Sequence, residues 1–124
     1  MNGFLKYGLI VLLFCLTSFV SVDEVESAIK NGNASQLSKY FDNTIEITLT
    51  DKSNTYSKSQ AELVLKDFFS NNVVKGFEIV HKGNNAGAQF IIGTLETKNG
   101  EYRTTIYMKQ KGDKQLLQEL RFEK

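Results

Sequence analysis

The stretch Ser57–Ser70, SKSQAELVLKDFFS, decides how this chain is organised. Its apolar residues recur with the spacing i, i+3, i+4, i+7 and i+8, which places them along one side of an α-helix. These residues are Ala61, Val64, Leu65, Phe68 and Phe69. Ser57 precedes Gln60 by three residues and Ser59 precedes Glu62 by three, the spacing of a capping box that marks the start of a helix. We therefore predict an amphipathic helix whose two adjacent phenylalanines need a large apolar surface.

The residues after 76 are predicted to supply that surface as four strands. The expected strands are Phe77–His81, Ala88–Thr97, Glu101–Lys111 and Gln115–Glu123. Asn84–Gly87, Asn99-Gly100 and Gly112-Asp113 are the expected turns, and Asn99-Gly100 is typical of a two-residue type I′ hairpin. Gly93 lies inside a strand pattern, which indicates a bend or a bulge. Such closely spaced strands favour an antiparallel meander.

The first half of the chain predicts two short helices and one strand. A helix beginning at Ser21 or Asp23 and a second one containing Leu37, Tyr40 and Phe41 are separated by Asn31-Gly32, a typical helix stop. Ile45–Leu49 alternates apolar and polar residues as a half-exposed strand does. Asp51–Thr55 is interpreted as a polar turn. Helices segregated from a run of antiparallel strands predict an α+β fold.

Residues 1–21 have the pattern of a signal peptide. Lys6 is followed by the uncharged apolar run Tyr7–Val20, which is shorter than the ~20 residues that span a bilayer. We expect this segment to be removed, leaving residues 22–124 as one exported domain of the periplasm or cell envelope. The alternatives are an uncleaved membrane anchor and a buried N-terminal helix. Cys15 lies in the apolar run, where it is interpreted as apolar filler.

The composition argues against several classes of function. The chain of 124 residues has 15 basic and 14 acidic side chains without a run of either sign, so a basic surface for nucleic acid is not expected. It has one histidine and one cysteine, too few for an ordinary zinc site. The sequence also lacks a glycine-rich phosphate loop and other cofactor motifs. We expect neither a metal nor a cofactor.

Two groups of residues resemble known families. Ala28–Leu37 followed by Tyr40-Phe41-Asp42 is similar to the opening of nuclear-transport-factor-2-like domains, which have a cone-shaped α+β fold related to that of the cystatins. A second set resembles a family of small exported bacterial domains of unknown function: Tyr56–Lys58, Leu65–Phe69, His81, Ile92-Gly93 and Gly100–Arg103. The resemblance covers essentially all of the chain after residue 21. It implies a strongly curved antiparallel sheet with the helix at 57–70 packed along its concave face.

The same resemblance implies a pocket at the wide mouth of the cone, lined by inward-facing strand residues. The candidate lining residues are Tyr56, Phe69, Phe77, His81, Met108 and Phe122. Strand alternation places His81 on the concave face with Phe77 and Ile79. Its ring is the one side chain whose unperturbed pKa, about 6.5, lies near working pH. His81 is thus the first candidate for a ligand contact or a base, against the simpler interpretation of a structural histidine at a strand end.

Arg103, Tyr107 and Arg121 are candidates for a protein interface. Alternation turns them away from Ile106 and Leu120, toward the convex face of the sheet. Exposed arginine and tyrosine are typical of interfaces, and a homodimer through this face is one expectation; charged decoration of a solvated face is the other. Asp42 is interpreted as a turn or cap residue.

This fold does not by itself identify the function, because it is shared by isomerases, dehydratases, transport factors and dimerisation modules. We expect a non-catalytic module that binds a small apolar ligand or a protein partner. The alternative is a small lyase or isomerase that acts on an apolar substrate with His81 as the base. Catalysis normally needs at least two placed polar groups, and the sequence offers few for the pocket.

The export prediction can be checked by mass. Protein purified from the cell envelope should lack roughly the first 20 residues, as the architecture of a signal peptide implies. Intact-mass spectrometry measures this directly. A full-length product in the cytosol would contradict the prediction.

Overall fold

The computed structural model describes residues 22–124, so the predicted signal peptide lies outside the described residues. Residues 22–30 are helical. The elements that follow are α2 (Ala34–Ser38), β1 (Phe41–Leu49), β2 (Lys52–Ser57), α3 (Lys58–Asn71), β3 (Val74–Asn85), β4 (Ala88–Thr97), β5 (Gly100–Lys111) and β6 (Lys114–Glu123). Among the described residues, no helix combines the length and the apolar character needed to cross a membrane.

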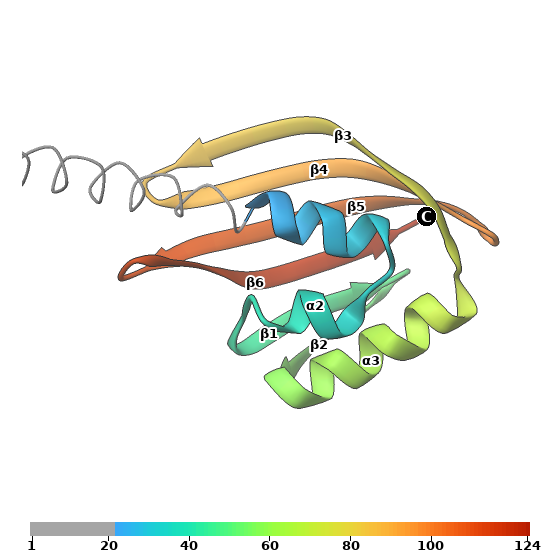
Figure 1. Cartoon of the computed structure of the whole chain (residues 1–124), viewed down its shortest axis with the longest axis horizontal. Coiled ribbons are helices and arrows are strands. Elements are labelled where there is room, and N and C mark those ends of the chain that lie inside the picture. The colour runs from blue at the N-terminus through green and yellow to red at the C-terminus, as the bar shows by residue number, and fades with distance from the viewer. Residues whose placement is uncertain (1–21) are drawn as a thin grey trace, which may run out of the picture.

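The strands form one six-stranded sheet in the order β2-β1-β6-β5-β4-β3. The predicted meander from β3 to β6 is confirmed, with antiparallel pairing throughout. The sheet also contains one parallel pair, β1 with β6, which brings the first strand beside the last. Figure 1 shows the sheet curving around the helices, which gather on one side of it. The predicted α+β architecture is therefore confirmed.

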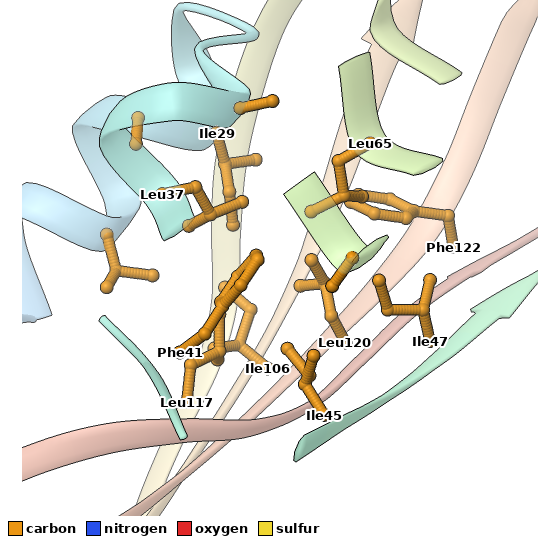
Figure 2. Packing of buried hydrophobic residues seen from close by; sticks show 14 of the residues in the cluster. Ile29, Leu37, Phe41, Ile45, Ile47, Leu65, Ile106, Leu117, Leu120 and Phe122 are labelled. Atoms are coloured by element: carbon orange, nitrogen blue, oxygen red, sulfur yellow. The ribbon is translucent and has the colours of Figure 1, made fainter. Parts of the chain in front are cut away.

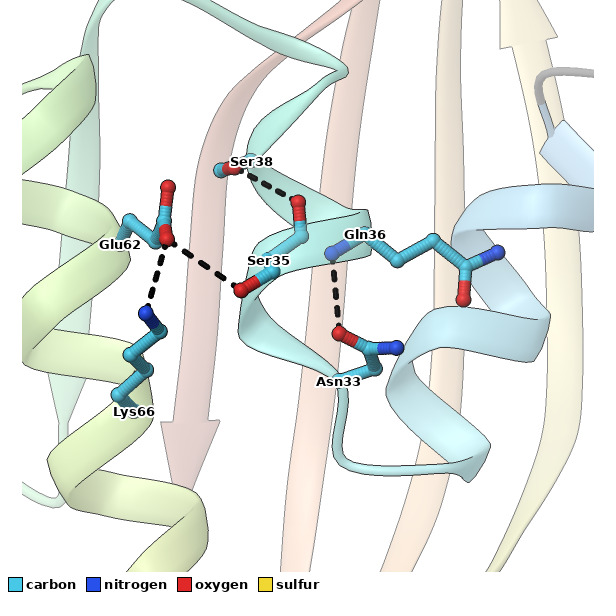
Figure 3. A network of polar contacts seen from close by, with 6 residues as sticks. All are labelled: Asn33, Ser35, Gln36, Ser38, Glu62 and Lys66. Carbon is cyan, nitrogen blue, oxygen red and sulfur yellow. Dashed lines mark hydrogen bonds and ion pairs between the residues drawn. The ribbon is translucent and has the colours of Figure 1, made fainter.

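Helix α3 begins and packs as its sequence predicts. Ser57 is the N-cap: the Gln60 backbone N–H donates to Ser57 Oγ, and the Ser57 N–H donates to Gln60 Oε1, both at 3.4 Å. Glu62 and Lys66 form an i,i+4 ion pair at 3.2 Å. Glu62 also accepts a hydrogen bond of 3.4 Å from Ser35 Oγ, which links α3 to α2 (Figure 3). These contacts fix both the start of α3 and its position beside α2.

The core lies between the helices and the concave face of the sheet. The Phe68 ring stacks on Phe122 of β6 with centroids 4.7 Å apart, and meets Tyr102 edge to face at 5.2 Å. Phe69 meets the other side of the same cluster, 6.0 Å from Phe122. Figure 2 shows side chains from the helices meeting side chains of β1, β5 and β6 in this core. The two phenylalanines therefore find their apolar surface on the sheet.

A polar network anchors the C-terminal end of α3 to the turn between β4 and β5. Asn72 Nδ2 donates to the Phe68 carbonyl at 2.9 Å, and Asn72 Oδ1 accepts from Tyr102 Oη at 3.0 Å. Asn99 Nδ2 lies 2.6 Å from the Asn71 carbonyl, to which it donates. Because Asn72 is buried, these bonds satisfy polar groups that would otherwise be costly to bury.

Two expectations for the first half of the chain are wrong. The segment Asp51–Thr55 is not a turn, since Lys52–Ser57 forms β2 and pairs with β1. It is an edge strand with almost every side chain exposed, so it lacks the alternation that identifies strands. The second helix ends at Ser38, and Phe41 instead begins β1 opposite Leu117. Phe41 is buried by strand packing rather than by the face of a helix.

The hairpin between β4 and β5 also differs from the prediction. Thr97 lies opposite Gly100, so the two-residue loop is Lys98-Asn99 rather than Asn99-Gly100. Gly100 has a φ of 111°, and the described non-glycine residues with positive φ are Thr50 and Ala86. A type I′ turn needs positive φ at both central residues, so this loop is not of that type. The Gly112-Asp113 turn lies where it was predicted.

Replacement of Phe68 should be far more damaging than replacement of its neighbour on α3. Phe68→Ala removes a ring that is 6% exposed and packed on three aromatic rings, and should lower the free energy of unfolding by about 3–5 kcal/mol. Lys66→Ala on the exposed side should cost less than about 0.5 kcal/mol. Chemical denaturation of both variants measures the difference. Equal midpoints would mean that α3 does not pack through this face.

Candidate functional site

A cavity of about 990 Å³ lies at the end of the sheet where the β3–β4 and β5–β6 hairpins extend beyond the described helices (Figure 1). The sheet contributes Lys82, Asn84, Gln89, Ile91, Gln110 and Gln115 to its lining. The rim includes Val22 and Asp23 at the start of the described chain, Lys39 and Tyr40 after α2, and Asp113 and Lys114 in the β5–β6 turn. This volume is at the upper end of the range for sites that hold drug-sized ligands.

Four of the strand residues that line the cavity are side-chain amides, and we call them the amide floor: Asn84, Gln89, Gln110 and Gln115. The strand register explains why they lie together. Asn84 is opposite Gln89 on the β3–β4 pair, and Gln110 is opposite Gln115 on the β5–β6 pair. Gln89 is also opposite the fully buried Met108, so the amide floor continues the concave face that carries the core.

The amides of the floor are only partly satisfied by the protein. Gln110 Nε2 donates to the Gly112 carbonyl at 3.1 Å. Gln115 Nε2 donates to Gln110 Oε1 at 3.5 Å, the long limit for such a bond. Gln115 Oε1 is buried and accepts no hydrogen bond from any described residue. Because Gln115 Oε1 has no exposed surface, the donors and acceptors that remain available to a ligand are those of Asn84, Gln89 and Gln110.

The charged residues around the cavity have mixed signs. Lys39, Lys82 and Lys114 lie there with Asp23 and Asp113. None of these five belongs to an ion pair within residues 22–124, where the ion pairs are Glu62–Lys66, Asp42–Lys111 and Glu123–Arg121. The cavity is thus neither strongly basic nor strongly acidic.

Asp42 holds the β5–β6 hairpin that forms one wall of the cavity. Its carboxylate lies 2.6 Å from Lys111 Nζ and accepts a hydrogen bond of 2.9 Å from Gln118 Nε2. The contact with Lys111 is the main cause that lowers the pKa of Asp42. Asp42 is therefore a buried strand residue with a tertiary role, and its interpretation as a turn or cap residue is wrong.

The structure places the predicted pocket residues outside this cavity. Phe69, Met108 and Phe122 are buried in the core. Tyr56 and Phe77 are half-buried and pack against that core from β2 and β3. The prediction assumed that inward strand residues border open space, whereas the helices fill the space in front of them.

His81 lies on the opposite face of the sheet from the one predicted. Ile79 is opposite Gly93 but His81 is opposite Ile92, so Val80 is an extra residue in a β-bulge. The bulge reverses the alternation, because two residues of β3 occupy the length of one residue of β4. His81 is exposed, and Lys82 takes the position that faces Ile91 and the cavity.

Arg103, Tyr107 and Arg121 lie on the face opposite Ile106 and Leu120, as alternation predicts. We call this the outer face. Tyr107 packs on Phe90 with ring centroids 4.7 Å apart, and Phe90 is 42% exposed. Arg121 forms an ion pair with Glu123 at 3.3 Å. The outer face therefore combines an exposed aromatic pair with charged residues of both signs.

Two carboxyl groups also meet on the outer face. Glu46 of β1 lies opposite Glu119 of β6. Burial raises the pKa of Glu119, with a further contribution from Glu46. The hydrogen bond from Ser53 at 2.7 Å lowers the pKa of Glu46, helped by Glu119. Neither residue lines the cavity.

The residues that line the cavity were not singled out by the sequence analysis. The sequence did contain a signal for them. Gln89 continues the series of inward-facing residues Leu95, Gly93 and Ile91, and Gln110 continues the series Ile106 and Met108. A polar residue at the end of a series of inward-facing apolar residues indicates where the helices no longer cover the concave face. Residues 22–124 contain no group of three or more histidine, cysteine, aspartate or glutamate side chains placed to hold a metal ion.

Comparison with known proteins identifies the family. The sequence model of a domain of unknown function, DUF4783, matches residues 22–123. The chain is 32% identical to a DUF4783 family protein from Bacteroides ovatus (TM-score 0.79, covering 82% of this chain and 92% of that one). It is 34% identical to another from Bacteroides fragilis (TM-score 0.78, covering 82% and 95%).

A search of curated proteins finds no match to this chain. At the level of the fold, a protein of the nuclear-transport-factor-2-like family from Streptomyces avermitilis is 9% identical, with a TM-score of 0.61 and coverage of 84% of this chain and 90% of that one. The similarity in fold agrees with the resemblance seen in the sequence. The chain therefore belongs to the DUF4783 family of domains of unknown function and has the nuclear-transport-factor-2-like fold.

Proposed function

We propose that this protein is an exported, non-catalytic binding module whose ligand occupies the cavity beside the amide floor. The observation that carries the proposal is the cavity itself, about 990 Å³ and lined by side chains from β3, β4, β5 and β6. Concave sites with a few convergent polar groups are the usual binding sites of small molecules. Because these groups lie on paired strands, their positions are set before a ligand arrives.

The alternative of a lyase or isomerase with His81 as its base has less support. His81 is exposed on the outer face of the sheet, away from the side chains that line the cavity. The acids of the cavity, Asp23 and Asp113, lie at its rim and have no hydrogen-bonded base beside them among the described contacts. A general base needs a partner that fixes its protonation state and its orientation. Binding requires only hydrogen-bond donors and acceptors, which the amides of the cavity provide.

The proposal is tested by NMR on ¹⁵N-labelled protein. Mixtures of small sugars, amino acids, dipeptides and fatty acids are added in turn, and the side-chain amide signals of Asn84, Gln89, Gln110 and Gln115 are followed. At least one class should shift these signals. Asn84→Trp, which fills the cavity, should abolish the shifts, whereas Asn54→Trp on the exposed edge strand β2 should leave them intact. Shifts confined to other surfaces, or none, would contradict the proposal.

We also propose that two copies associate through the outer face. The support is the Phe90–Tyr107 pair, in which Phe90 is exposed, on the same face as Arg103 and Arg121, since aromatic residues and arginine are enriched at interfaces. Positively and negatively charged residues on one face can pair across a two-fold axis, because the same surface of each copy contacts that of the other.

Sedimentation velocity over a dilution series checks this association. The wild-type protein should form a dimer, and Arg103→Glu should weaken it by about tenfold, because it reverses the charge of an exposed residue in the proposed interface. Lys58→Glu is the matched control, since it reverses a charge at an exposed position of α3, and it should not change the affinity of the dimer. A monomer at every concentration, or equal effects of both reversals, would overturn the proposal.

A further inference from the structure

The concave face changes its chemistry where the described helices stop covering it. Along β5, the buried Ile106 and Met108 are followed two residues later by exposed Gln110. Along β6, buried Leu117 is preceded by half-buried Gln115, and along β4 buried Ile91 is preceded by half-buried Gln89. Three neighbouring strands thus pass from an apolar residue to an amide, and Gln110 and Gln115 lie two residues beyond the level of Gln89.

Amides restrict the kind of ligand that the cavity can take. Each of them offers two N–H donors and a carbonyl acceptor. An apolar ligand would remove these groups from water without replacing their hydrogen bonds, which is costly. A simple anion only accepts hydrogen bonds, so the amide oxygens and the carboxylates of Asp23 and Asp113 would face it unfavourably. The matching ligand carries donors and acceptors at short spacing.

Hydroxyl groups satisfy this requirement, because each one both donates and accepts. Gln110 is exposed and its Oε1 holds only one bond of 3.5 Å, so it can accept a further bond from a ligand hydroxyl. Tyr40 adds an aromatic ring that is half-buried against the core and lines the cavity. An aromatic ring with a polar tip suits a ligand that has both CH surfaces and hydroxyls.

A peptide fits less well. Peptides gain most of their affinity from side chains in apolar pockets or from pairing with a strand edge. Four apolar residues line the cavity: Val22, Phe90, Ile91 and Leu116. Ile91 is 2% exposed, and the strand register places Phe90 and Leu116 at outer-face positions, so they form no apolar pocket on the amide floor. The ring of Phe90 packs on Tyr107 of the outer face rather than on the amide floor.

We propose that the cavity binds a short neutral saccharide, held by the amide floor and Tyr40; this inference rests on the proposed binding function. Glutamine and asparagine side chains would pair with neighbouring hydroxyls, and Lys82 and Asp113 would add a donor and an acceptor at the edges of the site. The charges of mixed sign around the cavity suit a neutral ligand better than a charged one.

The test uses the protein as purified from its cells and probes of matched size. Neutral di- to tetrasaccharides, oligosaccharides of uronic acids, peptides of similar mass and a medium-chain fatty acid are titrated by calorimetry and by NMR. At least one neutral saccharide should bind more tightly than every other probe and shift the amide signals of the floor. Gln89→Leu and Gln110→Leu should each weaken it by about three- to tenfold, the effect of losing hydrogen bonds.

Gln36→Leu on α2 is the matched control, since this glutamine does not line the cavity, and it should leave saccharide affinity unchanged. Thermal unfolding of each variant verifies that it is folded, and exposed Gln110 keeps the test valid if Gln89→Leu does not fold. If peptides or charged probes shift the amide signals of the floor and neutral saccharides do not, the saccharide inference is wrong while the proposed binding function stands. If no probe shifts the floor, both are wrong.

Discussion

The stacking of Phe68 on Phe122 is the contact on which the rest of this fold depends. It joins α3 to the last strand of the chain at a centroid distance of 4.7 Å, and Phe69 and Tyr102 close around the same two rings. Because β6 is the strand that pairs with both β1 and β5, fixing α3 on β6 also fixes it over the middle of the sheet. The polar network at Asn72 then sets where the helix ends.

This arrangement explains why the candidate site lies away from the core. The short α2 and the helix at 22–30 fill the concave face next to α3, with Val25, Ile29 and Leu37 buried against it. The strands of the meander are longer than this covered region, since β3 and β5 have 12 residues each. Their ends therefore extend beyond the described helices, and the concave face continues there as a cavity wall that water can reach. The Asp42–Lys111 ion pair holds that wall to β1.

Sequence patterns predicted the fold well because the deciding signals are local. The capping box and apolar spacing of α3 and the bounds of β4, Ala88–Thr97, follow from residues within one element. Strand β2 was missed because an exposed edge strand is recognised by its partner, not by its own side chains. The site was missed for a related reason. How much of the sheet the helices cover depends on tertiary packing, and Gln110 and Gln115 line the cavity only because the described helices do not reach them.

The misplacement of His81 has a separate and more specific cause. A Cβ at Gly93 would lie 2.6 Å from the Glu78 carbonyl oxygen and 2.8 Å from the Phe77 ring, so only glycine allows β3 to approach β4 this closely. Directly after that approach the register shifts, and Val80 is left without a partner and 68% exposed. Gly93 was expected to mark a bend or bulge, and the bulge lies in the strand opposite to it. This one extra residue turns His81 outward and Lys82 and Asn84 inward, so it decides which side chains the cavity receives. The side chains that face the cavity from this part of β3 are therefore an ammonium and an amide rather than an imidazole.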